Sequence, residues 1–130
     1  MLHLTIGSIG FITRRRTDVE SAQRTAEGLR IVLEELRDRL RELYGERLVQ
    51  MILYGSQARE DAEPESDVDV LVVLRGAVAP GEEISRTSET VADISLRHNA
   101  VVSCVFMDED SFVRRNGPFL RNVRREGVPI

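Results

Sequence analysis

Residues 53–73 read LYGSQAREDAEPESDVDVLVV, and this stretch decides the fold of the chain. An apolar run over residues 48–54 stops at Gly55, and a polar loop then leads to a second apolar run that opens with Asp67 and Asp69. Short apolar runs bounded by turn residues are typical of buried β-strands. The stretch therefore predicts two strands joined by a tight turn and a polar loop.

The turn after the first run is suited to an anion. Gly55 has no Cβ, so its backbone can turn sharply and come close to a ligand. Ser56 is expected to cap a short helix that ends at Arg59, and its hydroxyl and the free N–H groups of that first turn form an electropositive cradle for a phosphate. Every basic residue of the chain is Arg. Gly55, Ser56 and Arg59 are therefore the predicted triphosphate-binding residues, with Arg59 as the cation.

The two acids of the second run are two positions apart. On a strand this spacing places Asp67 and Asp69 on one face, while Val68 and Val70 point to the opposite layer. Carboxylate oxygens are hard ligands that suit Mg²⁺, which takes its other ligands from water and a triphosphate. Asp67 and Asp69 are the predicted metal ligands. The alternative is a β-loop-β unit whose serine only caps a helix and whose acids only solubilise a strand end.

Together these residues resemble the signature of the minimal nucleotidyltransferases of the DNA polymerase β superfamily. The matching positions are Gly55-Ser56, Ala58-Arg59, Ser66-Asp67 and Asp69. The resemblance implies a polymerase-β-like fold and the transfer of a nucleotide, usually AMP from ATP, to a hydroxyl group with Mg²⁺ or Mn²⁺ as cofactor. It also implies that Asp67, Asp69 and Ser56 are the catalytic residues.

The third strand departs from the family pattern. A third carboxylate usually stands there and helps to bind the metal and to take the proton of the attacking hydroxyl, but Ser103 is the only polar side chain in the run VVSCVF. Serine is neither an anionic ligand nor a base at neutral pH. Asp93, Asp108 and Glu109 would reach the site only if the expected strand register were wrong. The alternative to an enzyme is therefore a nucleotide-binding or toxin-neutralising module that has lost turnover.

Residues 48–130 are similar to the antitoxin-type members of this family, which pair with a small helical HEPN-domain toxin. In that group the acceptor is a hydroxyl on the partner protein. The resemblance thus implies a nucleoside triphosphate and a HEPN-domain toxin as partners. A homo-oligomer is left open by the sequence.

Composition agrees with one small intracellular domain. With 130 residues the chain can form a single core, in which residues 1–47 add a tail and a long helix to a nucleotidyltransferase core over residues 48–130. A net charge of −4 argues against a broad nucleic-acid surface.

The apolar runs are too short to span a membrane. A single cysteine, Cys104, implies no disulfide and fits the cytoplasm.

The remaining pattern predicts a helix over residues 18–44, a helix over residues 82–98 and a third strand over residues 100–107. Leucines at helical spacing give the first helix an apolar face, and Glu35 with Arg39 is expected to form an exposed ion pair on it. Asp108 is expected to cap a short helix, and Pro118 to open a last helix that ends at Gly127. The predicted fold class is α/β (α+β): a small mixed sheet with helices packed on it.

Overall fold

The computed structural model describes residues 18–59 and 67–130, with side chains described from residue 26 onward. The elements in chain order are α1 (Asp18–Tyr44), the 3-10 turn η2 (Gly45–Arg47), β1 (Leu48–Tyr54), α2 (Ser56–Arg59), β2 (Val68–Leu74), α3 (Pro80–His98), β3 (Val102–Asp108), α4 (Glu109–Arg114), α5 (Pro118–Glu126) and β4 (Val128–Pro129). The predicted N-terminal tail before residue 18 lies outside the described residues. None of the described helices is long and apolar enough to cross a membrane.

The four strands form one mixed sheet in the order β3-β2-β1-β4. β1 runs antiparallel to β2 and to the short β4, whereas β2 and β3 are parallel and are joined through α3. β2 is therefore a central strand, which explains why its apolar residues are buried on both faces of the sheet. The predicted fold class, a small mixed sheet with packed helices, is confirmed.

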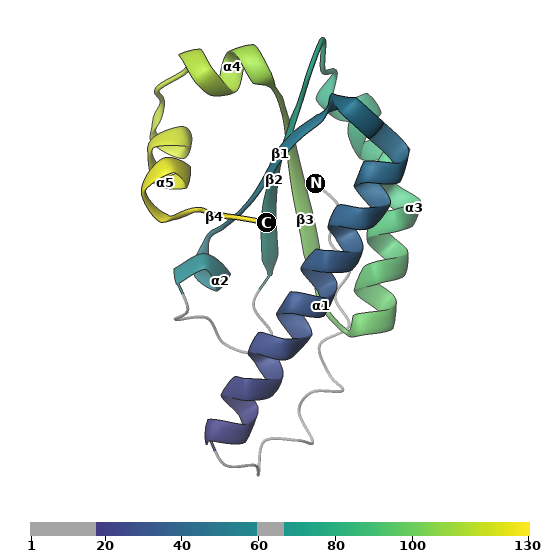
Figure 1. Cartoon of the computed structure of the whole chain (residues 1–130), viewed down its shortest axis with the longest axis vertical. Helices are drawn as coiled ribbons and strands as arrows, with labels where there is room; N and C mark the ends of the chain where they lie inside the picture. Colours follow the sequence, from purple (N-terminus) through teal and green to yellow (C-terminus); the bar gives the residue numbers. More distant parts are fainter. Residues whose placement is uncertain (1–17, 60–66) are drawn as a thin grey trace.

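The two faces of the sheet carry separate cores. α1 and α3 lie side by side over one face, and α4 and α5 lie on the other (Figure 1). Val70 and Val72 of β2 point to α1 and α3, whereas Leu71 and Val73 point to α5. This alternation follows from the period of two in a strand. It also fixes the face of Asp69, which lies on the α5 side with Leu71.

Most predicted boundaries agree with the structure, with small differences. α3 begins at Pro80, two residues before the predicted start, because proline suits the first turn of a helix. β3 spans Val102–Asp108 instead of residues 100–107. The two-residue strand β4 is absent from the prediction. Leu43, one of the leucines at helical spacing that were expected on the apolar face of α1, does not join its buried face, since the residue is 44% exposed. The division of the chain at residue 47 stays a prediction.

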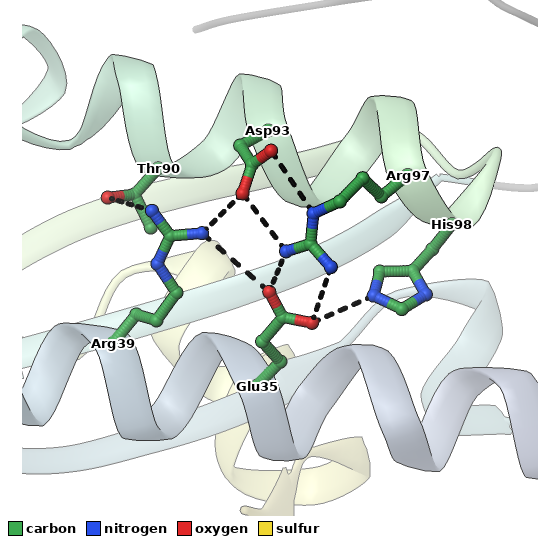
Figure 2. A network of polar contacts seen from close by, with 6 residues as sticks. All are labelled: Glu35, Arg39, Thr90, Asp93, Arg97 and His98. Carbon is green, nitrogen blue, oxygen red and sulfur yellow. Dashed lines mark hydrogen bonds and ion pairs between the residues drawn. The ribbon is translucent and has the colours of Figure 1, made fainter.

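A network of charged and polar side chains joins α1 to α3 (Figure 2). We call it the interhelical network; its members are Glu35, Arg39, Thr90, Asp93, Arg97 and His98. Arg39 Nη1 lies 2.6 Å from Asp93 Oδ2 and 3.6 Å from Glu35 Oε2. The predicted Glu35–Arg39 pair is therefore present, but the prediction that it is exposed is wrong. Both side chains are partly buried between the helices, because Arg39 bridges to α3.

Candidate nucleotide and metal site

Gly55 and Asp69 lie close together at the end of β1. Gly55 follows β1 with a φ of +77°, and a Cβ built there would lie 2.7 Å from Asp69 Oδ2. Only glycine adopts this left-handed conformation without strain. The missing side chain therefore serves two purposes: it permits the turn, and it leaves room for a carboxylate oxygen.

The two predicted metal ligands lie where β2 begins. Asp67 immediately precedes β2 and Asp69 is its second residue, and both side chains are partly buried. Val68 and Val70, between and after them, are buried in the core under α1 and α3. The acids and the valines therefore lie on opposite faces of the sheet, as predicted. Asp69 pairs with Tyr54 of the antiparallel strand β1.

Ser103 lies directly beside Asp69. The parallel register of β2 and β3 makes these two residues partners, so both are on the same face of the sheet. Ser103 is fully buried, and its Oγ has no hydrogen-bond partner among the described residues. An unpaired buried hydroxyl costs about 1–3 kcal/mol, and in native proteins it calls for an explanation such as a bound ion, water or ligand. Cys104 points to the other face and packs in the core.

Tyr54 is a neighbour of the site that the sequence did not reveal. Burial, and after it the charge of Asp69, raises the pKa of the Tyr54 phenol to about 12. The hydroxyl group therefore stays protonated beside the carboxylate at neutral pH. A weak signal was present: where two successive strands pair antiparallel, the end of the first lies near the start of the second.

The short helix α2 follows Gly55 as predicted, but the prediction that Ser56 caps it is wrong: Ser56 is the first residue of α2, and Gly55 stands at the capping position because its carbonyl accepts the first helical hydrogen bonds. The Gly55 carbonyl accepts hydrogen bonds from the backbone N–H groups of Ala58 (3.1 Å) and Arg59 (3.3 Å). The Arg59 side chain is 44% exposed, and its Nη1 lies 3.3 Å from Glu126 Oε2 at the end of α5. Arg59 thus has a carboxylate neighbour that its sequence position did not suggest. Gln57, at the centre of the helix, is buried.

The other acids considered from the sequence lie elsewhere. Asp93 belongs to the interhelical network on the opposite side of the sheet. Asp108 caps α4, where its Oδ2 accepts a hydrogen bond from the Ser111 N–H at 2.9 Å. It stands five positions beyond Ser103 on one strand, which corresponds to roughly 17 Å. Glu109 lies 3.8 Å from Arg75. None of the three takes the place of a third carboxylate beside Asp69.

The donor set suits a divalent ion that is shared with a triphosphate. Asp67 and Asp69 supply hard carboxylate oxygens, and the Ser103 hydroxyl beside them lacks a partner. Within the described part of the chain, no three His, Cys, Asp or Glu side chains gather closely enough to hold a metal by themselves. Two carboxylates without further protein ligands fit Mg²⁺, which usually keeps water and phosphate ligands.

Comparison with known proteins shows the family of the chain. The family model described as "Nucleotidyltransferase domain" matches residues 33–117. The chain belongs to this nucleotidyltransferase family. The match covers most of the elements described above, from the second half of α1 to the end of α4.

Two relatives of the nucleotidyltransferase chain extend the comparison. A protein of Methanocaldococcus jannaschii named "putative protein adenylyltransferase" is 31% identical over 96 residues, which are 73% of this chain and 90% of that protein. A crystal structure of a "putative nucleotidyltransferase" from Sulfolobus solfataricus superposes with a TM-score of 0.50 over 89% of each chain, at 19% identity. The second likeness shows the fold alone. The family match and the Methanocaldococcus jannaschii relative confirm the resemblance to nucleotidyltransferases that was inferred from the sequence.

Proposed function

We propose that this chain transfers AMP from Mg-ATP to a hydroxyl group on a partner protein. The observation that carries the proposal is the close approach of the Asp69 carboxylate to Gly55, a turn without a side chain. Membership in the nucleotidyltransferase family supports the reaction class. The name of the Methanocaldococcus jannaschii relative, a protein adenylyltransferase, supports a protein as the acceptor.

Each residue of the site has a proposed role. Asp67 and Asp69 hold Mg²⁺, and Gly55 and Ser56 hold the triphosphate. When bound, Mg²⁺ supplies positive charge that offsets the charge of the phosphates. Arg59 exchanges its contact with Glu126 for a phosphate oxygen; a surface pair of this kind contributes only about 0–1 kcal/mol.

In the proposed reaction the acceptor oxygen attacks the α-phosphorus of ATP. The new bond joins the acceptor oxygen to phosphorus, the bond between the α-phosphorus and the oxygen bridging to the β-phosphate breaks, and pyrophosphate leaves. The proton of the acceptor hydroxyl must pass to a base. In this proposal Ser103, the strand partner of Asp69, stands in for the third carboxylate, and serine does not take up that proton at neutral pH.

Ser103 supports a second candidate function. A chain that binds the nucleotide but lacks a base would act as a nucleotide-binding or toxin-neutralising module without turnover. In both versions we propose a HEPN-domain toxin as the partner and the cytoplasm as the compartment. The two versions differ in one observable, the covalent transfer of AMP.

Mass spectrometry of the intact partner tests the proposal. The chain is co-purified with a HEPN-domain toxin and incubated with Mg-ATP, and we expect the toxin to gain the mass of one AMP group. The double variant Asp67→Asn, Asp69→Asn is the matched control, because it keeps the shape of the site and removes its charge. No mass gain with the wild type, together with tight Mg-ATP binding, would favour the non-catalytic module. An equal mass gain with the double variant would contradict the site assignment.

A further inference from the structure

An exposed aromatic ring stands next to the candidate site. Phe119, in the first turn of α5, packs against Tyr54 with ring centroids 5.2 Å apart and ring planes at 89°. Tyr54 is the residue before Gly55 and the strand partner of Asp69. Tyr54 is therefore a neighbour both of Phe119 and of the residue proposed to hold the metal.

The position of Phe119 on α5 indicates which way it faces. Phe119 and Glu126 are seven positions apart, so they lie on one stripe of the helix. Glu126 contacts Arg59 of α2 at 3.3 Å, and Phe119 contacts Tyr54 of β1. One stripe of α5 thus runs along the turn that joins β1 to α2, and α5 and α2 are neighbours in Figure 1.

Phe119 is only partly buried in the core. Its neighbour Leu120 and the buried Val123 of the same helix are 3% and 2% exposed, whereas Phe119 is 38% exposed. The edge-to-face contact with the partly buried Tyr54 holds the ring in a fixed orientation. A large, oriented, exposed aromatic ring beside a phosphate site has the properties of a stacking surface for a nucleobase.

We propose that Phe119 stacks on the base of the nucleoside triphosphate, with Tyr54 as its support. The proposal rests on the proposed function, since it places the base of the nucleotide whose phosphates lie at Gly55. Every base has a π face, so stacking is tolerant of base identity. The site would therefore bind nucleoside triphosphates as a class, and the base would add affinity that inorganic triphosphate lacks.

Calorimetry with two probes, Mg-ATP and Mg-tripolyphosphate, tests the proposal. Phe119→Leu keeps an apolar side chain against Tyr54 and removes the ring, and Phe119→Tyr keeps the ring. We expect the wild type and Phe119→Tyr to bind ATP about 5- to 100-fold more tightly than tripolyphosphate. Phe119→Leu should lose that advantage and bind tripolyphosphate as the wild type does. Val113→Ala, which changes an exposed apolar residue of α4, is the control and should bind both probes like the wild type.

The outcomes separate this proposal from the proposed function. Equal affinity of the wild type for both probes would overturn stacking and leave the triphosphate site standing. A parallel loss of both probes in Phe119→Leu would show that the ring only supports the fold around Tyr54, and would also overturn stacking. Failure of the wild type to bind either probe would overturn the proposed function, and stacking with it.

Discussion

Gly55 meets two constraints at a single position. Its φ of +77° lies in the left-handed region, and a Cβ there would lie 2.7 Å from Asp69 Oδ2. A left-handed backbone costs a residue with a Cβ about 1–2 kcal/mol. We expect Gly55→Ala to lower the free energy of unfolding by about that amount. It should also displace the Asp69 carboxylate, so that calorimetry detects no Mg-ATP binding.

Gly76 provides a matched control for the backbone effect. It also has a positive φ, +85°, but a Cβ built there has no atom within 4 Å. Gly76→Ala should therefore lose a similar free energy of unfolding in urea denaturation and keep its affinity for Mg-ATP. If Gly55→Ala binds Mg-ATP as the wild type does, the phosphates do not lie beside Gly55.

Ser103 allows a test of the missing base. Ser103→Asp places an acid beside Asp69, where it would share the metal and accept the acceptor proton. Without metal the nearby carboxylates repel one another, so the variant should unfold at lower urea concentration than the wild type, and Mg²⁺ should restore its stability. A general base contributes typically about 10²- to 10⁴-fold. We expect slow transfer of radiolabelled AMP by the wild type and faster transfer by Ser103→Asp.

Ser103→Asn is the control for this change. Its amide has nearly the size of the carboxylate but neither accepts a proton nor carries charge, so it should not accelerate transfer. Fast transfer by the wild type that Ser103→Asp leaves unchanged or slows would show that another group supplies the base. The position of Ser103 beside Asp69 would then have no catalytic meaning.

At the scale of elements, local chemistry fixes the boundaries that the sequence predicts correctly. β1 ends where Gly55 supplies a positive φ, and α4 begins where the Asp108 carboxylate accepts from the Ser111 N–H. α5 runs from Pro118 to Glu126, with Gly127 as its C-cap. Each of these signals acts within a few residues, so periodicity and capping rules are sufficient to find it.

These rules do not predict elements and contacts that depend on partners far away in the sequence. β4 exists because Val128 pairs with β1 and the Ile130 N–H donates to the Met51 carbonyl, and nothing in the two-residue segment itself predicts a strand. The contacts of α5 with Tyr54 and Arg59 have the same origin. The sequence therefore predicts the phosphate turn, the two acids and the position of Ser103. The position of α5 beside these residues depends on how the helix packs on the sheet, which the local sequence does not reveal.

At the scale of the whole molecule, the interhelical network adds polar contacts to the apolar packing of α1 against α3. Hydrogen bonds from Arg97 and then His98 lower the pKa of Glu35 to about 2. Hydrogen bonds from Arg97 and then Arg39 lower the pKa of Asp93 to about 2. Both carboxylates are thus ionised in the folded protein down to lower pH than in the unfolded chain, where their pKa values are near 4.5 and 3.8. Since these folded-state pKa values are depressed, the stabilisation is complete above about pH 5 and is lost as the pH falls toward 2.

The double variant Glu35→Gln, Asp93→Asn should weaken this acid response. Its amides retain hydrogen-bonding capacity but do not titrate, so the variant should be less stable than the wild type at pH 7 and should approach it as the pH falls from 5 to 2. Urea midpoints measured across that range check the prediction, with Glu42→Gln, an exposed position of α1, as the control. A difference between wild type and double variant that is the same at pH 7 and pH 2.5 would show that the network contributes through shape alone. Because the network lies across the sheet from Asp69, Mg-ATP affinity at pH 7 should be the same in all three proteins as long as they are folded.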